Sequence, residues 1–297
     1  MKKVSVIIVN YNTKLLTKQC VDSVICQTKD VDYEIIVVDN ASSDGSKELF
    51  ENNEQIRYIY SDVNLGFGKA NNLAYKYSTG QYIFLLNSDT ILLNDAISRF
   101  VMYFDNYADT NVACLGTILK QEDGITENNS YSEFPSISSN IKFFISYYCQ
   151  TCKNLDNAVT SSQFQVDYVI GADLFIKRSV IDRLGLFDPS FFMYFEDSEL
   201  QFRYSKNGYK SMIISGPQII HLEGASSIFG TRLIGKKARM YFNGMLTYMG
   251  KRYSGLKYLI ARVVMFGFIP MMVYNKTFNL IPSLFKSKSF FNSNLYE

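Results

Sequence analysis

Short apolar runs alternate with segments of helical periodicity over the first ninety residues. Four runs predict strands: residues 4–9, 33–38, 56–60 and 82–86. Between the first two runs, apolar residues recur at helical spacing behind Thr13, which we expect to cap a helix. Asp44-Gly45-Ser46 opens another helix. The repeated strand–helix unit predicts an α/β fold with a Rossmann-like, mostly parallel, doubly wound sheet.

Polar residues follow three of these predicted strands. They are Asn10 and Asn12, Asp39 and Asn40, and Asn87 and Asp89. Because the carboxyl ends of the strands line the ligand crevice of an open α/β sheet, the three clusters should converge on a nucleotide site. The alternative is turn chemistry, in which Asn, Asp and Ser side chains satisfy loop backbone. Three such clusters in succession favour the site.

The rest of the chain changes in character twice. Residues 121–140 are polar and predict a mobile loop or an insertion, and order resumes at Val166. Beyond Gly230, apolar residues are interleaved with Lys and Arg, which is typical of amphipathic helices with a basic rim. The longest apolar run, 263–273, is about half of the ~20 residues that span a bilayer, so we expect no spanning helix. We expect no secretory signal either, because the apolar run after Lys3 is too short.

Composition and charge narrow the class of protein. The chain has 297 residues, of which 47% are hydrophobic, enough for one large domain or for one domain with an appendage. Five scattered cysteines fit a reducing compartment better than a disulfide framework. Residues 230–297 hold 11 bases and one acid, a charge of +10, which leaves 19 bases and 27 acids, or −8, for the rest. An acidic body with a basic tail argues against nucleic acid as the partner and permits a membrane-facing tail.

Three positions are candidates for chemistry. Asp89 follows a buried strand, where one carboxylate with substrate phosphates can hold Mg²⁺ or Mn²⁺. Glu196 and Asp197 follow five apolar or aromatic residues. Apolar surroundings disfavour ionisation of a carboxyl and raise its pKa, which suits a general base; the alternative is that the acids simply favour a helix amino terminus. His221, the only histidine, can bind a divalent ion or a phosphate, or be structural.

Two other motifs are weak. Cys149 and Cys152 supply only two of the four ligands of a structural zinc. Residues 64–70 contain two glycines but lack both the Lys-Ser/Thr ending of a phosphate-binding loop and the third glycine of a dinucleotide fingerprint. We therefore do not expect a P-loop enzyme or a dehydrogenase.

Read together, the segments resemble the family 2 glycosyltransferases of the GT-A fold, in particular the rhamnosyltransferase-like branch that builds bacterial surface polysaccharides. The resemblance lies in seven motifs in family order: residues 4–12, 37–46, 64–72, 85–89, 171–178, Glu196-Asp197 with Arg203, and His221. It implies a GT-A catalytic domain over residues 1–229, with a nucleotide-sugar half of about 1–115 and an acceptor half of about 116–229. Residues 230–297 then form a helical, basic, amphipathic extension for membrane association or dimerisation.

The resemblance also implies roles for single residues. Those of the donor site are Asn10, Tyr11, Asn12 and Asp39 for base and ribose, Asn64 and Lys69 in the segment that closes over the nucleotide, and Asn87. Asp89 and His221 match the metal positions, and Asp197 matches the general base. The sugar and acceptor pocket takes Gly171, Ala172, Asp173 and Glu196. The metal motif is usually Asp-x-Asp, and Asn87 at its first position leaves most of the charge to Asp89.

The implied activity is that of an inverting, metal-dependent glycosyltransferase of the EC 2.4 class. Its donor is dTDP-rhamnose or a UDP-hexose, and its acceptor is a saccharide or a polyprenyl-diphosphate-linked glycan of a capsule or O-antigen. The implied location is cytoplasmic, peripheral on the inner face of the cytoplasmic membrane. A basic rim with Met265, Phe266, Phe268, Met271 and Met272 fits that location, whereas packing on the catalytic domain or a homodimer is the alternative for the tail.

Two other functions are alternatives, of which the sequence disfavours the second. One is a non-catalytic nucleotide-sugar-binding assembly subunit that keeps the fold. Loss of transfer in Asp197→Asn with donor binding intact would favour an enzyme over such a subunit. The other is a nucleotidyltransferase, which would want a basic glycine-rich loop near the amino terminus, and residues 10–14 do not offer one.

Overall fold

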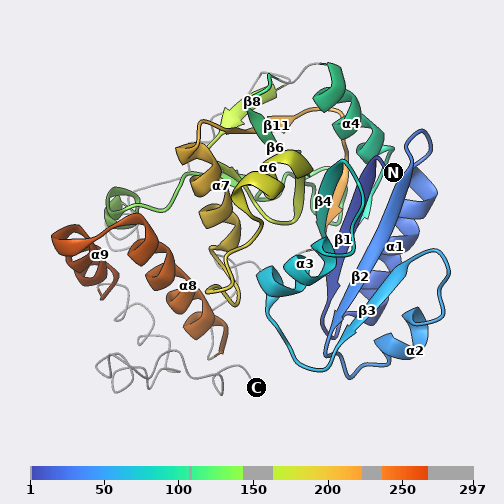
Figure 1. Ribbon diagram of the computed structural model, residues 1–297, viewed down its shortest axis with the longest axis horizontal. Coiled ribbons are helices and arrows are strands. Elements are labelled where there is room, and N and C mark those ends of the chain that lie inside the picture. The colour runs from blue at the N-terminus through green and yellow to red at the C-terminus, as the bar shows by residue number, and fades with distance from the viewer. Residues whose placement is uncertain (1, 107–108, 143–162, 223–235, 267–297) are drawn as a thin grey trace. The chain divides into compact units, whose positions relative to one another are not determined.

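The computed structural model describes residues 2–106, 109–142, 163–222 and 236–266 (Figure 1). The chain divides into two compact units. Among the described residues, the first unit holds 2–106, 109–134, 163–192 and 196–222. The second unit holds 135–142, 193–195 and 236–266. The second unit thus takes in two short segments from outside the C-terminal extension.

An eight-stranded sheet forms the centre of the first unit. Its strands are β1 (Val4–Asn10), β2 (Tyr33–Asn40), β3 (Arg57–Ser61), β4 (Tyr82–Asn87), β6 (Val112–Gly116), β8 (Gln163–Val166), β10 (Asp173–Lys177) and β11 (Lys210–Ile214). They are ordered β3-β2-β1-β4-β10-β6-β11-β8. Only β10 and β8 run against the other strands, so the predicted mostly parallel sheet is confirmed.

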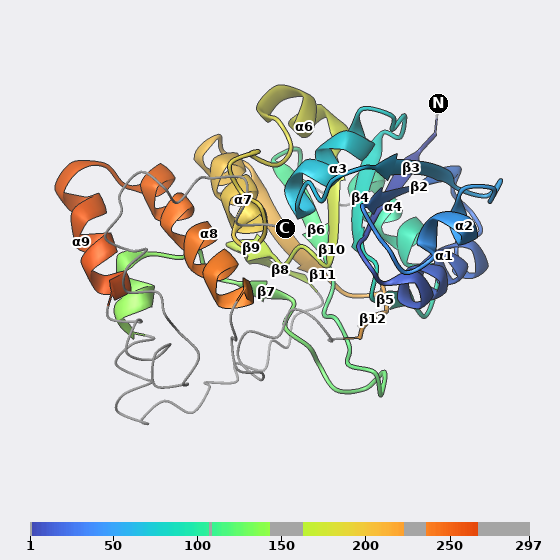
Figure 2. The same ribbon diagram turned by 90° about the horizontal axis from the view of Figure 1, so that it is seen from below.

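Helices cover both faces of this sheet. They are α1 (Lys14–Gln27), α2 (Ser46–Phe50), α3 (Phe67–Tyr75), α4 (Ala96–Asn106), α6 (Arg178–Leu184) and α7 (Glu196–Lys206). One apolar core joins α1 and α4 to the sheet, and a second joins α3, α6 and α7 to it. Alternate residues of β1 supply the two cores, Val6 and Ile8 the first and Ile7 the second. Figure 2 shows α1 and α3 on opposite sides of the sheet, as a doubly wound fold requires.

Two short ladders bring distant segments of the first unit together. Strand β5 (Thr90–Leu92) pairs antiparallel with β12 (Ile219–His221), and β7 (Tyr131–Ser132) pairs with β9 (Tyr168–Val169). In the first ladder Thr90 lies opposite His221. The pairing therefore carries the single histidine to the residue that follows Asp89.

Two helices, α8 (Lys236–Arg252) and α9 (Gly255–Phe266), make up the described part of the C-terminal extension. The predicted helical character is confirmed there. Buried residues recur at helical spacing along α8, at Phe242, Met245 and Met249. Neither helix, nor any other among the described residues, is long and apolar enough to cross a bilayer. Of the tail residues that the sequence singles out, Phe268, Met271 and Met272 lie outside the described residues, as do Cys149 and Cys152.

Helix α1 begins directly after Thr13, as predicted, but the Thr13 side chain does not cap it. The Thr13 side chain makes no capping hydrogen bond, and the carboxylate of Asp44 accepts one from the Lys14 backbone N–H at 2.8 Å instead. The Thr13 hydroxyl bonds Asn10 Oδ1 (2.9 Å) and lies 3.1 Å from the Ser88 hydroxyl. A carboxylate from a neighbouring loop is the better acceptor at a helix amino terminus, because it also meets the positive end of the helix dipole.

Candidate active site

The carboxyl ends of β1 and β2 meet at one serine. Asn10 lies beside Asp39 in the strand register. The Ser42 hydroxyl accepts hydrogen bonds from Asn10 Nδ2 at 3.0 Å and from the Asn12 N–H at 2.9 Å, while the Ser42 N–H donates to Asp39 Oδ1 at 2.9 Å. With the contact between Thr13 and Ser88, these bonds confirm that the three polar clusters converge. Ser42 is not among the predicted site residues, although it lies within the motif of residues 37–46.

Asp39 is fully buried, and each of its carboxylate oxygens accepts a hydrogen bond from the protein. The second donor is the hydroxyl of Tyr58 on β3, at 2.8 Å from Oδ2. Burial, together with this carboxylate, raises the pKa of Tyr58, so that its hydroxyl remains a donor. Nothing in the sequence pattern singles out Tyr58, because the pairing depends on the neighbouring strand.

The other predicted donor residues either shape loops or face solvent. Asn12 has a left-handed backbone (φ 54°), and its Oδ1 accepts the Ser43 N–H at 2.8 Å. Asn64 Oδ1 accepts both Asn40 Nδ2 (3.0 Å) and the Gly66 N–H (2.9 Å) just before α3. Tyr11 and Lys69 are exposed. The loops at this edge are thus held by hydrogen bonds of the asparagine side chains. The exposed side chains of Tyr11 and Lys69 are available to a ligand.

The two predicted metal ligands lie together. His221 Nε2 is 3.3 Å from Asp89 Oδ1, and both side chains are largely buried, with exposed fractions of 5% and 13%. The Leu222 N–H also donates to the backbone carbonyl of Asp89 at 2.8 Å, which holds the end of β12 against the start of β5. An imidazole and a carboxylate side by side form a donor set that suits Mg²⁺ or Mn²⁺ only if further oxygen ligands join.

The residues fit such an ion, with a limit. His221 Nε2 is buried and makes no hydrogen bond, although it lies within ion-pair distance of Asp89, so one nitrogen is left for a ligand. Within the described ranges, no group of three or more His, Cys, Asp and Glu side chains gathers to hold a metal. The remaining ligands would have to be diphosphate oxygens and water, as is common for Mg²⁺.

Asp197 lies in the first turn of α7 and is held by backbone donors. Its Oδ2 accepts the Gly171 N–H at 3.0 Å and its Oδ1 accepts the Ser198 N–H at 2.7 Å. Burial raises the pKa of Asp197, and these two bonds work against that rise. A Cβ at Gly171 would stand 3.4 Å from the Asp197 Cβ, so the chain approaches closely here. A fixed carboxylate with a raised pKa is suited to accept a proton.

Residues 171–173 connect the predicted base, Asp197, to the predicted metal motif at residues 87–89. The Ala172 carbonyl accepts the Asn87 N–H at 3.0 Å, one residue along from the bond between Gly171 and Asp197. Asp173 opens β10 and is fully buried, with Oδ2 accepting the Thr117 N–H at 2.8 Å and Oδ1 unpartnered. Burial raises the pKa of Asp173 well above its ordinary value. The sugar-pocket role of these residues stays a prediction. The carboxyl of Asp173 is fully buried and holds the Thr117 backbone, so its contact is with the sheet rather than with a ligand.

Glu196 is the second acid of the α7 amino terminus. It is 6% exposed, and its Oε2 makes no hydrogen bond. Burial and the adjacent charge of Asp197 both raise the pKa of Glu196. The pair therefore favours one ionised and one neutral carboxyl, which separates their roles even though they are neighbours in the chain.

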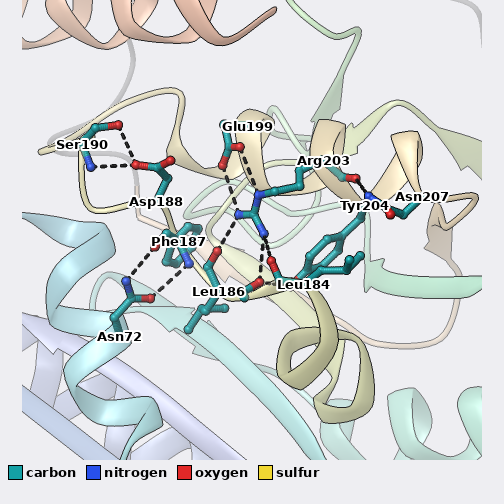
Figure 3. A network of polar contacts seen from close by, with 11 residues as sticks. Asn72, Leu184, Leu186, Phe187, Asp188, Ser190, Glu199, Arg203, Tyr204 and Asn207 are labelled. Atoms are coloured by element: carbon teal, nitrogen blue, oxygen red, sulfur yellow. Dashed lines mark hydrogen bonds and ion pairs between the residues drawn. The ribbon is translucent and has the colours of Figure 1, made fainter.

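A polar network supports the loop that leads to these acids (Figure 3). The Arg203 guanidinium pairs with Glu199 at 3.1 Å and donates to the carbonyls of residues 184–186 at the end of α6. Asn72 on α3 bonds both the N–H and the carbonyl of Phe187, at 3.0 and 2.7 Å. The network ties α3, α6 and α7 together behind the site.

The fold is that of a glycosyltransferase of the GT-A type. Residues 5–169, more than half of the chain, match Glycosyl transferase family 2, and the protein belongs to that family. It is similar to the rhamnosyltransferase WbbL of Escherichia coli (strain K12), with 28% identity over 228 residues, which cover 73% of this chain and 83% of WbbL.

Solved structures share the fold at low sequence identity. One is S. aureus TarS 1-349 in complex with UDP-GlcNAc, with a TM-score of 0.57 and 15% identity over 90% of this chain and 71% of the other. Another is the mannosyltransferase PcManGT from Pyrobaculum calidifontis in complex with GDP-Man and Mn²⁺, with a TM-score of 0.54 and 16% identity over 95% and 78% of the two chains. The predicted family and GT-A fold are thereby confirmed.

Proposed function

We propose that the protein is an inverting glycosyltransferase that moves a sugar from a nucleoside-diphosphate donor to a hydroxyl of a saccharide or polyprenyl-diphosphate-linked acceptor. The observation that supports the proposal is a pair of backbone hydrogen bonds from adjacent residues. Gly171 donates to the carboxylate of Asp197, whose pKa is raised, and Ala172 accepts from Asn87, two residues before Asp89. A proton acceptor and an anion-stabilising centre are the two groups that the reaction needs.

The proposed reaction is a single displacement. The acceptor oxygen forms a bond to the anomeric carbon, and the carbon–oxygen bond to the diphosphate breaks with its electron pair leaving on phosphate. The acceptor proton passes to Asp197, whose two backbone hydrogen bonds fix its orientation. One displacement inverts the anomeric centre. A divalent cation, when bound by Asp89 and His221, would offset the charge that grows on the leaving phosphate.

The donor and the pathway are part of the proposal. WbbL is named a rhamnosyltransferase, which supports dTDP-rhamnose as donor and bacterial surface polysaccharide as product. TarS in complex with UDP-GlcNAc supports a uridine-linked hexose as the second donor class. The Mn²⁺ in the PcManGT complex supports Mg²⁺ or Mn²⁺ as cofactor.

The test is release of nucleoside diphosphate by the purified protein with Mn²⁺, against thymidine-, uridine- and guanosine-linked sugars, with Asp89→Ala and Asp197→Asn in parallel. Slow metal-dependent release from one donor, lost in both variants, supports the transferase and names the donor. Binding of a donor without release, with or without a panel of saccharide acceptors, would instead favour the non-catalytic assembly subunit.

We further propose that α9 rests on an anionic membrane surface. Four apolar side chains at helical spacing are exposed on it: Leu256 (72%), Leu259 (55%), Ile260 (44%) and Val263 (63%). Lys257 and Arg262 lie on the same helix, and each base near an anionic leaflet contributes about 1 kcal/mol. Met265, which the sequence suggested for this contact, is fully buried and does not serve it.

Vesicle flotation tests this location. The full chain should float with phosphatidylglycerol vesicles more than with phosphatidylcholine vesicles, and Leu259→Glu should abolish the difference. Leu15→Glu is the matched control, since Leu15 is also an exposed leucine (69%, against 55% for Leu259) and lies on α1. No flotation, together with a Leu259-dependent dimer in sedimentation, would assign the stripe to a homodimer instead.

A further inference from the structure

Two consecutive bulky residues just before Glu196 and Asp197 have a left-handed backbone. Tyr194 has φ 72° and Phe195 has φ 68°. Such values are uncommon outside glycine, asparagine and aspartate, and for aromatic residues they persist only where the surroundings enforce them. Glu196 and Asp197 are the next two residues in the chain. The direction in which α7 leaves this turn therefore depends on whatever holds the turn.

The turn belongs to the second unit, where a glycine of α8 receives it. A Cβ at Gly244 would stand 2.5 Å from the Tyr194 carbonyl oxygen and 3.2 Å from that of Met193. The first distance is one that real Cβ atoms do not reach, and the atom met is backbone rather than a movable side chain. On the same helix, the ring of Tyr241 lies 4.9 Å from the ring of Phe195 and 5.9 Å from that of Tyr194.

The residue before the turn is held by another glycine, in the first unit. The Phe192 carbonyl accepts the Phe67 N–H at 2.9 Å, and a Cβ at Gly66 would stand 2.3 Å from that carbonyl oxygen. Gly66 itself has a left-handed backbone (φ 79°) at the start of α3. The chain is thus held by glycine contacts at Phe192 and at Tyr194, and little backbone freedom remains before Asp197.

We propose that α8 positions the general base, with Gly244 as a positioning residue that acts through the Tyr194–Phe195 turn. The proposal rests on the proposed role of Asp197 and adds a catalytic function to the C-terminal helical unit. A displaced Tyr194 carbonyl would rotate the first turn of α7 and lengthen the bond between Asp197 and the Gly171 N–H. Donor contacts at β1 and β2 lie on other elements and should be unaffected.

The experiment compares Gly244→Ala with Gly250→Ala in the full chain. Both glycines lie within α8, so both variants gain the same helix propensity. A Cβ at Gly250 meets only the Tyr258 ring, at 3.5 Å or more, which is ordinary contact. We expect Gly244→Ala to lower kcat about tenfold or more, with the donor Kd within twofold of wild type, by the usual sensitivity of catalysis to misplaced groups. Gly250→Ala should keep wild-type kcat.

A second pair of variants decides the matter if Gly244→Ala does not fold. Tyr241→Ala removes the ring that packs on Phe195, and Tyr241→Phe keeps it. The first should lower kcat without changing the donor Kd, and the second should restore it. Wild-type kcat in both Gly244→Ala and Tyr241→Ala overturns the proposal, as does a loss in which donor binding and thermal stability fall together with kcat.

The same assay separates this proposal from the one on which it rests. A wild type that turns over and an Asp197→Asn variant that does not uphold the general base, so wild-type kcat in Gly244→Ala then counts against α8 alone. An Asp197→Asn variant with wild-type kcat removes the general base and the positioning role together.

Discussion

The two sides of the site differ in how their polar groups are satisfied. On the side of β1 and β2, Asn10 and Asp39 are fully buried and all of their side-chain oxygens and nitrogens take part in protein hydrogen bonds. On the opposite side, three buried atoms have no hydrogen-bond partner: Oδ1 of Asp173, Oε2 of Glu196 and Nε2 of His221. Buried unpartnered polar atoms are costly and gather where function needs them.

This difference separates shape from reactivity. The satisfied side presents side chains whose positions are fixed by protein hydrogen bonds, which suits the proposed nucleotide site. The other side holds carboxyls with raised pKa values, and on it Glu196 Oε2 and His221 Nε2 are left for a substrate, proton or cation to complete. Variants on the two sides should therefore have different signatures, binding or stability on one side and turnover on the other.

The largest expected effect is at Asp197. Asp197→Asn keeps the size of the side chain but removes the proton acceptor, so transfer should fall by about 10²–10⁴-fold. The donor Kd, measured by calorimetry, should change little. Transfer within threefold of wild type would contradict the general-base role.

The next effect is at the pair of Asp89 and His221. Asp89→Ala should lower transfer by roughly 10²-fold or more, because the growing charge on the leaving group loses its stabilisation. His221→Ala leaves the carboxylate in place and should mainly raise the Mn²⁺ concentration needed for half-maximal activity. Titration of activity with Mn²⁺ distinguishes the two variants, and equal Mn²⁺ dependence in wild type and His221→Ala would remove His221 from the metal site.

A smaller effect concerns the response of stability to pH. Folding raises the pKa values of Asp173 and Glu196, so the folded state binds their protons more tightly than the unfolded state. Their contribution to stability is complete below the unfolded pKa values and is lost as pH rises through the folded ones. Burial and Asp197 raise the pKa of Glu196 from 4.5 to about 8, so Glu196→Gln removes the titrating group and should flatten this loss by more than the ~1.4 kcal/mol that one pKa unit represents. Urea unfolding between pH 5 and pH 8 measures it.

The smallest effect tests the satisfied side. Tyr58→Phe removes one hydrogen bond to buried Asp39 and should cost about 1–2 kcal/mol of unfolding free energy. Because Asp39 also holds the Ser42 N–H at the predicted nucleotide edge, a shifted Asp39 should raise the donor KM a few-fold and leave kcat unchanged. A kcat loss as large as that of Asp197→Asn would erase the distinction between the two sides.

The periodicity of the first ninety residues predicted the parallel strands and their order of appearance, but not where they end. The polar residues Asn10, Asn40 and Asn87 are the last residues of β1, β2 and β4 rather than the first residues of loops. Pairing with the neighbouring strand continues through them, and a polar side chain does not reveal that. The prediction of the capping side chain of α1 failed for the same reason. The side chain that accepts the Lys14 N–H is Asp44, 30 residues further along the chain, and not Thr13.

The sequence by itself determined the class of fold and the family, and it singled out the candidate acids, because apolar periodicity and contiguous motifs are local properties. Only the tertiary structure decided which groups meet. The β5 and β12 ladder joins Asp89 to His221, Gly171 reaches Asp197, and Gly244 receives the turn before it. Each of these contacts joins residues that are 26 or more positions apart in the chain. No local sequence pattern encodes the distance between such residues in space.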